Sequence, residues 1–278
     1  MAELLIHGGR RLSGRVDVEG NKNAALPLLA ACLLTTETCE IRNVPHIRDV
    51  AVMIDLLQSL GATVEGRGTS TLRVTCRDIR SSEPDPKLVG KLRGSVLLLG
   101  ALLGRQKRAV IAPPGGDFPA RRSIATHLRA LVGLGARIVD TPAGHAIEAP
   151  DGLAGASMYL VEASVTGTET ALLAAAQASG PTEIRNAACE PHVAELCRFL
   201  AAMGVGVEGT GTSTIRIAPP GRLTGATHVL RGDYIEAASW AVVAAVTGGE
   251  VEVTGVHEQD LEPIAAVLAE LHLRFGLE

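Results

Sequence analysis

The hydrophobic pattern of the first 75 residues predicts an α/β unit of six elements. A strand of alternating apolar and polar positions precedes a helix rich in Ala and Leu, whose apolar circumference indicates burial on most sides. A second strand, an amphipathic helix and two strands around a Gly-rich turn follow. The expected elements cover residues 14–18, 23–34, 39–44, 49–60, 62–65 and 71–75. We expect Asp49 to cap the second helix and Gly61 to end it.

This pattern recurs along the chain. The Glu-Ile-Arg-Asn segment at 40–43 returns at 183–186, and the segment 68–74 returns at 211–217, both 143 residues later. A weaker copy covers 126–138. The glycines that end the amphipathic helices lie about 70 residues apart, at Gly61, Gly135, Gly204 and Gly276. The sequence therefore predicts a repeated β-α-β-α-β-β unit.

The fourth copy begins near residue 250 and is shorter than the others. It contains an expected strand at 249–253 and an expected helix at about 261–273, but no final strand pair before residue 278. Because domains seldom end on a sheet edge that awaits its partner, we expect this sequence to lack the remainder of a longer protein.

Composition and charge exclude several classes of protein. The chain is 46% hydrophobic and 20% charged, which excludes disorder. A net charge of -4 and only six aromatic residues argue against a nucleic-acid partner. We see no signal peptide and no apolar run of membrane-spanning length, and we expect a cytoplasmic protein with no membrane partner. The five cysteines lack paired spacing, so we expect no disulfide framework and no structural zinc site. We also expect no other metal and no cofactor.

Polar residues mark the start of each buried helix. They are found at 21–23, 93–95, 164–168 and 233–234. Two interpretations remain open for Ser164 and Asp233: simple helix caps, or helix N-termini that converge on a phosphorylated ligand. The ligand interpretation is stronger for Lys22, because a lysine at the start of an apolar helix is suited to binding a phosphate.

A loop at 113–122 carries the most specific polar pattern. Its Pro-Pro-Gly-Gly start interrupts both neighbouring elements, and Asp117 precedes Arg121 and Arg122. Asp117 could act as a general acid or base while the arginines bind an anion, or the loop could be a solvated turn with a surface ion pair. His127 follows in the next helix, where a packed histidine and a ligand contact are both compatible with the sequence.

Together these motifs resemble a known family. The segments 19–27, 93–95, 164–167 and 186–191, with the Pro-Gly-Gly-Asp loop, are similar to UDP-N-acetylglucosamine 1-carboxyvinyltransferases over essentially the whole chain. The resemblance implies transfer of the enolpyruvyl group from phosphoenolpyruvate to the 3-hydroxyl of UDP-N-acetylglucosamine, the first committed step of peptidoglycan synthesis. It links the protein to cell-wall formation, and through it to cell shape and cell division.

The resemblance also implies a fold and a domain plan. The family has an inside-out α/β barrel fold of about six β-α-β-α-β-β units in two domains, with helices inside and sheets outside. Residues 22–229 would form a complete second domain of three units. Residues 1–21 and 230–278 would form a partial first domain.

Site residues follow by matching the family's motifs. Lys22 and Asn23 match residues that contact phosphoenolpyruvate and the sugar, and Asp117 matches the catalytic acid, with Lys22 assisting catalysis. The other matched substrate-binding residues are Arg93, Arg122, Ser123, Ile124, Ala125, Thr126, His127, Ser164, Val165, Thr166, Glu190 and Asp233.

The chain departs from the family's pattern in three places. Asp117 replaces the usual Cys, which removes the thiolate that fosfomycin alkylates, so we expect insensitivity to this antibiotic. Ala125 stands where members typically carry Asp, and Glu162 where many carry Lys. The family's general base and the arginines that clamp phosphoenolpyruvate would lie beyond residue 278. Two interpretations remain open: the sequence is a truncated product, or a separate chain supplies the missing units.

Two other functions remain as alternatives. One is 3-phosphoshikimate 1-carboxyvinyltransferase, which shares the fold but fits the Asn-Lys-Asn and Gly-Gly-Asp segments less well. The other is a non-catalytic protein that binds a UDP-sugar. The acceptor that raises the melting temperature would discriminate between the two transferases.

Overall fold

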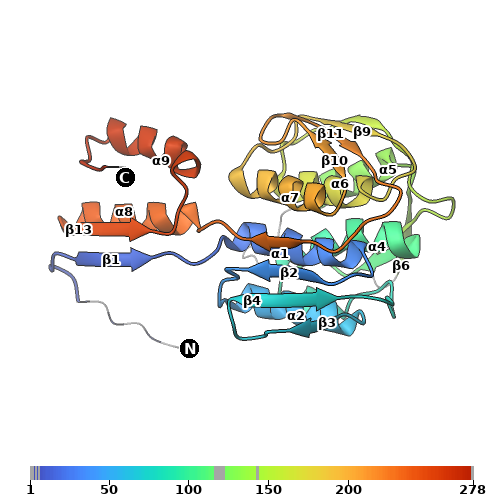
Figure 1. Ribbon diagram of the computed structural model, residues 1–278, viewed down its shortest axis with the longest axis horizontal. Helices are drawn as coiled ribbons and strands as arrows, with labels where there is room; N and C mark the ends of the chain where they lie inside the picture. Colours follow the sequence, from blue (N-terminus) through green and yellow to red (C-terminus); the bar gives the residue numbers. More distant parts are fainter. Residues whose placement is uncertain (1–2, 4, 6, 116–122, 142–143, 277–278) are drawn as a thin grey trace. The chain divides into compact units, whose positions relative to one another are not determined.

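Two compact units make up the chain in the computed structural model (Figure 1). The structure describes residues 3, 5, 7–115, 123–141 and 144–276. Residues 1–21 and 231–278 form unit 1, and residues 22–230 form unit 2.

Unit 2 is an alternation of helices and strands. Its helices are α1 (Lys22–Ala31), η1 (Cys32–Leu34), α2 (Arg48–Ser59), α3 (Pro86–Val89), η2 (Arg93–Leu97), α4 (Leu98–Gln106), α5 (Ala125–Gly133), α6 (Val165–Ala175) and α7 (Pro191–Ala202). Its strands are β2 (Cys39–Arg42), β3 (Thr63–Glu65), β4 (Thr71–Thr75), β5 (Arg108–Ile111), β6 (Arg137–Thr141), β7 (Gly144–Glu148), β8 (Ser157–Tyr159), β9 (Thr182–Arg185), β10 (Gly206–Glu208), β11 (Thr214–Ala218) and β12 (Thr227–Val229). Unit 1 contains β1 (Ser13–Asp17), α8 (Tyr234–Thr247), β13 (Glu250–Thr254) and α9 (Glu258–Glu270).

The strands of unit 2 form three sheets that follow one plan. The orders are β12-β2-β4-β3, β8-β9-β11-β10 and β5-β7-β6. In the two four-stranded sheets the first strand pairs in parallel with the second, and the remaining pairs are antiparallel. The equivalent order of these two sheets confirms that the repeat seen in the sequence is a structural repeat.

The repeated Glu-Ile-Arg-Asn segment has a structural reason. Asn43 and Asn186 adopt left-handed backbone conformations with φ of 57° and 55°. Each side-chain amide then donates to a backbone carbonyl just after the first strand of its sheet, at 3.0 Å to Leu230 and 2.8 Å to Leu160. The asparagine therefore ends one strand and holds its parallel neighbour.

The opening strands of the first and fourth copies are exchanged between the units. β1, which opens the first copy, pairs in parallel with β13 of the fourth in unit 1. β12 opens the fourth copy, which therefore begins at residue 227 and not near residue 250 as expected, and it pairs in parallel with β2 of the first copy in unit 2. The chain thus leaves unit 1 after residue 21 and returns to it at residue 231.

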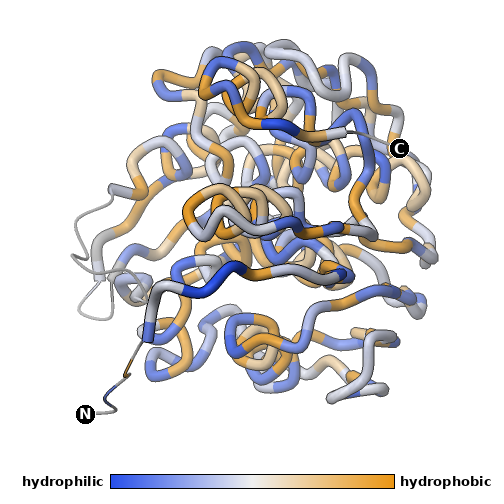
Figure 2. The backbone as a smooth tube through the Cα atoms, turned by 90° about the vertical axis from the view of Figure 1, so that its left-hand side faces the viewer, coloured by the Kyte–Doolittle hydropathy of each residue, from blue (hydrophilic) through white to orange (hydrophobic). Residues whose placement is uncertain are grey.

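Apolar helices occupy the interior of unit 2. Every residue of α1 from Ala24 to Ala31 is buried, and so is every residue of α6 from Gly167 to Ala175. Helix α4 packs against α6, and α1 packs against α2 and α7. The strands turn alternate residues inward onto these helices. Figure 2 shows the resulting interleaving of hydrophobic and hydrophilic segments along the backbone.

Three local expectations were wrong, and one was confirmed. Asp49 does not cap α2, because the helix begins at Arg48 after the extended Ile47. In the second copy, the described residues between β4 and η2 hold the short helix α3 in place of an opening strand. Helix α9 begins at Glu258 and not at about residue 261. The acidic residues of its first turn stabilise the helix N-terminus, although the apolar periodicity starts only after them. Gly61 ends α2 as expected, with φ of 110°.

A glycine and an arginine of α4 stabilise the packing of the interior. A Cβ on Gly100 of α4 would lie 2.5 Å from the carbonyl oxygen of Thr170 in α6, so only glycine permits this approach of the two helices. The guanidinium of Arg105, at the end of α4, donates to backbone carbonyls of separate segments. These acceptors are Leu33 at 3.0 Å, Cys76 at 2.8 Å and Arg77 at 2.8 Å.

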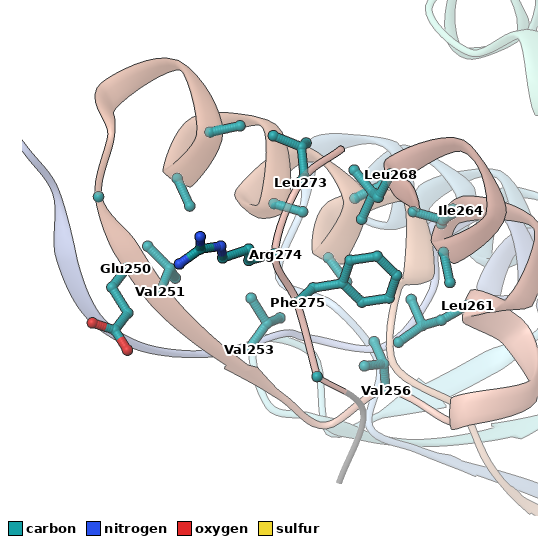
Figure 3. Close-up of a pocket in the computed structure, with 18 of the residues that line it drawn as sticks. Glu250, Val251, Val253, Val256, Leu261, Ile264, Leu268, Leu273, Arg274 and Phe275 are labelled. Atoms are coloured by element: carbon teal, nitrogen blue, oxygen red, sulfur yellow. The ribbon is translucent and has the colours of Figure 1, made fainter. Parts of the chain in front are cut away.

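Unit 1 contains a cavity of about 700 Å³. Apolar side chains from β13 and α9, together with Phe275, surround it (Figure 3). Among its described lining residues only Glu250 and Arg274 carry charge, so this cavity offers little to bind a polar ligand. In the described part of the chain, no helix has the length and apolar character needed to cross a bilayer.

Candidate functional site

A polar pocket of about 190 Å³ opens at the start of the buried helices of unit 2. Its lining comes from α1, α2, the segment that leads into η2, and the first turns of α6. The polar and charged lining residues are Lys22, Asn23, Asp49, Lys91, Arg93, Thr166 and Glu169. Five predicted site residues therefore meet in one pocket: Lys22, Asn23, Arg93, Val165 and Thr166.

Lys22 is the first residue of α1, where the helix N-terminus already favours anions. Its ammonium lies 3.3 Å from the carboxylate of Asp49, on α2. Both side chains are partly exposed, so this ion pair holds the lysine in place rather than contributing much stability.

Arg93 supplies a second cation to the same pocket. It lies at the start of η2, and one guanidinium nitrogen donates to the backbone carbonyl of Ser123 at 3.1 Å. The hydroxyl of Ser123 in turn accepts from the amide of Ala125 at 3.0 Å, at the start of α5. With Lys91 and Lys22, Arg93 gives the wall three cations against the carboxylate of Asp49, which suits an anionic ligand.

The start of α6 also lines the pocket, through Val165 and Thr166. Ser164 caps this helix by accepting from the amide of Gly167 at 3.2 Å, so the capping interpretation is confirmed for this residue. The hydroxyl of Thr166 bonds to Nε2 of His127 at 2.8 Å. His127 is buried at 2% exposure, so the packed interpretation is correct, and its partner is a pocket residue.

Burial controls the charge of His127. It lowers the pKa of the imidazole to about 4, with a further contribution from the nearby Arg93 cation. The ring is therefore neutral at physiological pH and does not add a positive charge beside the pocket.

Glu169 is a pocket residue that the sequence analysis did not select. It lies one turn into α6 and is 1% exposed, and its Oε1 has no hydrogen-bond partner within the described part of the protein. Burial and the nearby Glu190 raise the pKa of its carboxyl well above the usual range. A single acidic residue within the apolar run 165–178 is the sequence signal that could have identified it.

The other predicted residues lie in several places. Ile124 precedes α5, and Ala125 and Thr126 are the first two residues of this helix. The hydroxyl of Thr126 donates to the carboxylate of Glu162 at 3.4 Å. Glu190 occupies the N-cap position of α7 without a side-chain cap. Asp233 belongs to unit 1, where it caps α8 and accepts from Asn21 at 3.1 Å.

Asp117 and Arg122 fall outside the described residues. The roles expected for these two residues of the 113–122 loop therefore stay predictions. Among the residues that are described, no group of three or more His, Cys, Asp or Glu side chains is arranged to hold a metal ion.

Comparison with known proteins gives a consistent result. The chain is 43% identical over 262 residues to a UDP-N-acetylglucosamine 1-carboxyvinyltransferase from Bradyrhizobium diazoefficiens, a match that covers 94% of this chain and 60% of the relative. It is 40% identical over 278 residues to the enzyme of that name from Treponema denticola, covering 100% and 65% of the two chains. The chain thus spans less than two thirds of the length of these relatives.

The fold also matches solved structures. The crystal structure of the enolpyruvyl transferase NikO from Streptomyces tendae superimposes with a TM-score of 0.74 at 24% identity, covering 85% of this chain and 56% of NikO. This likeness confirms the predicted α/β fold class. The family model described as EPSP synthase (3-phosphoshikimate 1-carboxyvinyltransferase) matches residues 6–276. With nearly the whole sequence covered by that match, the chain belongs to the EPSP synthase family of carboxyvinyl transferases.

Proposed function

We propose that this chain binds phosphoenolpyruvate and UDP-N-acetylglucosamine and takes part in transfer of the enolpyruvyl group to the sugar 3-hydroxyl. The observation that carries the proposal is the pocket that brings together Lys22, Asn23 and Arg93. Its volume of about 190 Å³ is below the roughly 300 Å³ of pockets for drug-sized ligands. A small anion such as phosphoenolpyruvate suits this volume, and the nucleotide sugar would extend beyond it.

The chemistry divides into anion binding and proton transfer. Lys22 and Arg93 would hold the acidic groups of phosphoenolpyruvate, and the amides at the start of α1 would assist them. Asp117 would protonate the vinyl carbon while the sugar hydroxyl loses its proton and its oxygen attacks the adjacent carbon. Loss of a proton from the methyl group so formed would then expel phosphate and restore the double bond. By resemblance, the base and further arginines come from the part of the relatives that this chain does not match, so a second chain could supply them.

The direct test is phosphate release from phosphoenolpyruvate on addition of UDP-N-acetylglucosamine, with and without a chain that carries the unmatched region. We expect Lys22→Gln to weaken binding of phosphoenolpyruvate about tenfold, because it removes a charge-assisted contact. The control is Lys87→Gln, which changes an exposed lysine on α3 outside the pocket and should leave binding unchanged.

Two further measurements separate the alternatives. Stabilisation by shikimate 3-phosphate instead of UDP-N-acetylglucosamine would favour the alternative function, that of a 3-phosphoshikimate 1-carboxyvinyltransferase. Stabilisation by UDP-N-acetylglucosamine without turnover, even with the unmatched region supplied, would favour a binding protein. Fosfomycin should not inactivate the protein, whereas Asp117→Cys should introduce covalent inactivation.

A further inference from the structure

Among the described residues that line the polar pocket, Glu169 is the one buried acidic side chain. Glu169 lines the pocket together with Thr166 and Arg93, yet it is only 1% exposed. Oε1 accepts no hydrogen bond, and no ion pair of Glu169 is present among the described residues. A buried polar atom without a partner costs free energy, so its presence in a pocket wall points to a partner that arrives from outside the protein.

The surroundings decide which kind of partner fits. An ionised carboxylate buried without a compensating cation is unfavourable, and the nearby Glu190 makes ionisation harder still. A protonated carboxyl, by contrast, offers one O–H donor. Three cations, Lys22, Lys91 and Arg93, outnumber the single carboxylate of Asp49 in the rest of the pocket wall and attract an anion toward that donor.

We propose that Glu169 is a ligand-contacting residue of this pocket, in which the protonated carboxyl donates a hydrogen bond to an oxygen of the bound phosphate or carboxylate. This inference rests on the proposed function for the identity of the natural anion, and it names a contact that the proposed function does not require. The carboxyl and the two cations then bind the anion from different elements, since Glu169 belongs to α6, Lys22 to α1 and Arg93 to η2. Ionisation of Glu169 would replace this donor by a repelling charge.

Two substitutions separate donation from packing. Glu169→Gln keeps the size and an N–H donor, whereas Glu169→Met keeps the bulk and removes the hydrogen bond. The matched control is Thr170→Val, which changes the next residue of α6. Thr170 is fully buried and its hydroxyl is also without a partner among the described residues, but it does not line the pocket.

The experiment measures binding of phosphoenolpyruvate and of inorganic phosphate to the full chain by calorimetry. We expect Glu169→Met to weaken both about tenfold or more, while Glu169→Gln stays within about threefold of the wild type and Thr170→Val is unchanged. Isotope-edited infrared spectra should show a protonated carboxyl band that is absent from Glu169→Gln and shifts when phosphoenolpyruvate binds.

The remaining outcomes would overturn the role of Glu169, the proposed function, or both. Unchanged binding in Glu169→Met, or a carboxyl that is ionised in the infrared spectrum, overturns the role of Glu169 and leaves the proposed function intact. If phosphate binds but phosphoenolpyruvate and UDP-N-acetylglucosamine do not, the proposed function fails while the phosphate measurements still decide the role of Glu169. A wild type that binds none of the three overturns both.

Discussion

Acidification is expected to destabilise unit 2 through His127. The imidazole is 2% exposed and bonds to Thr166, and burial lowers its pKa from 6.5 to about 4. Above pH 6.5 the ring is neutral in both the folded and the unfolded chain, so it makes no pH-dependent contribution. Between pH 6.5 and about 4 the unfolded chain takes up a proton that the folded protein does not, and the free energy of unfolding falls as the pH falls.

The size of this effect follows from the two pKa values. At about 1.4 kcal/mol per pH unit, the difference between 6.5 and about 4 corresponds to at most about 3 kcal/mol, lost by pH 4. Below pH 4 both states are protonated and the loss stops growing. This is a large fraction of the stability of an ordinary domain.

The assay compares urea unfolding of the wild type with that of His127→Gln at intervals between pH 7.5 and 4. Gln preserves a hydrogen-bonding group toward Thr166 but does not titrate, so the difference between the two curves isolates His127 from other ionising groups. We expect the wild type to lose up to about 3 kcal/mol more than the variant over this range. Parallel curves, or an NMR titration of His127 with a midpoint near 6.5, would refute the reasoning.

Two further predictions concern the interior of unit 2. Gly100→Ala should lower the free energy of unfolding by about 1–3 kcal/mol, because its Cβ would lie 2.5 Å from the carbonyl oxygen of Thr170. The matched control is Gly221→Ala, whose Cβ would have open space around it. Equal melting temperatures for the two variants would contradict the packing argument. Arg105→Met should cost about 2–4 kcal/mol in urea unfolding, since three backbone carbonyls in two separate segments lose their donor. A loss below about 0.5 kcal/mol would mean that water replaces the guanidinium.

Much of the architecture was predictable because it is encoded locally. The apolar run of α1 indicated a helix buried on most sides, and the Glu-Ile-Arg-Asn repeat marked equivalent strands. Gly61 ended its helix as expected, since a positive φ is a property of a single residue and its neighbours. Errors arose at element boundaries. Asp49 has the residue type of a cap, but its position relative to Lys22, which is remote in sequence, decided its partner.

Relations between distant segments became known only from the folded chain. The repeated α/β unit, the fold class and the polar residues at the helix starts could all be predicted from the sequence. It did not determine that β1 and β12 exchange partners between copies, or that Glu169 is buried without a hydrogen-bond partner among the described residues. Hydrophobic periodicity reports which face of an element is buried, but not against which segment it packs. The charge state of a buried group likewise depends on desolvation and on neighbours brought close by folding, so His127 and Glu169 acquire their chemistry only in the folded chain.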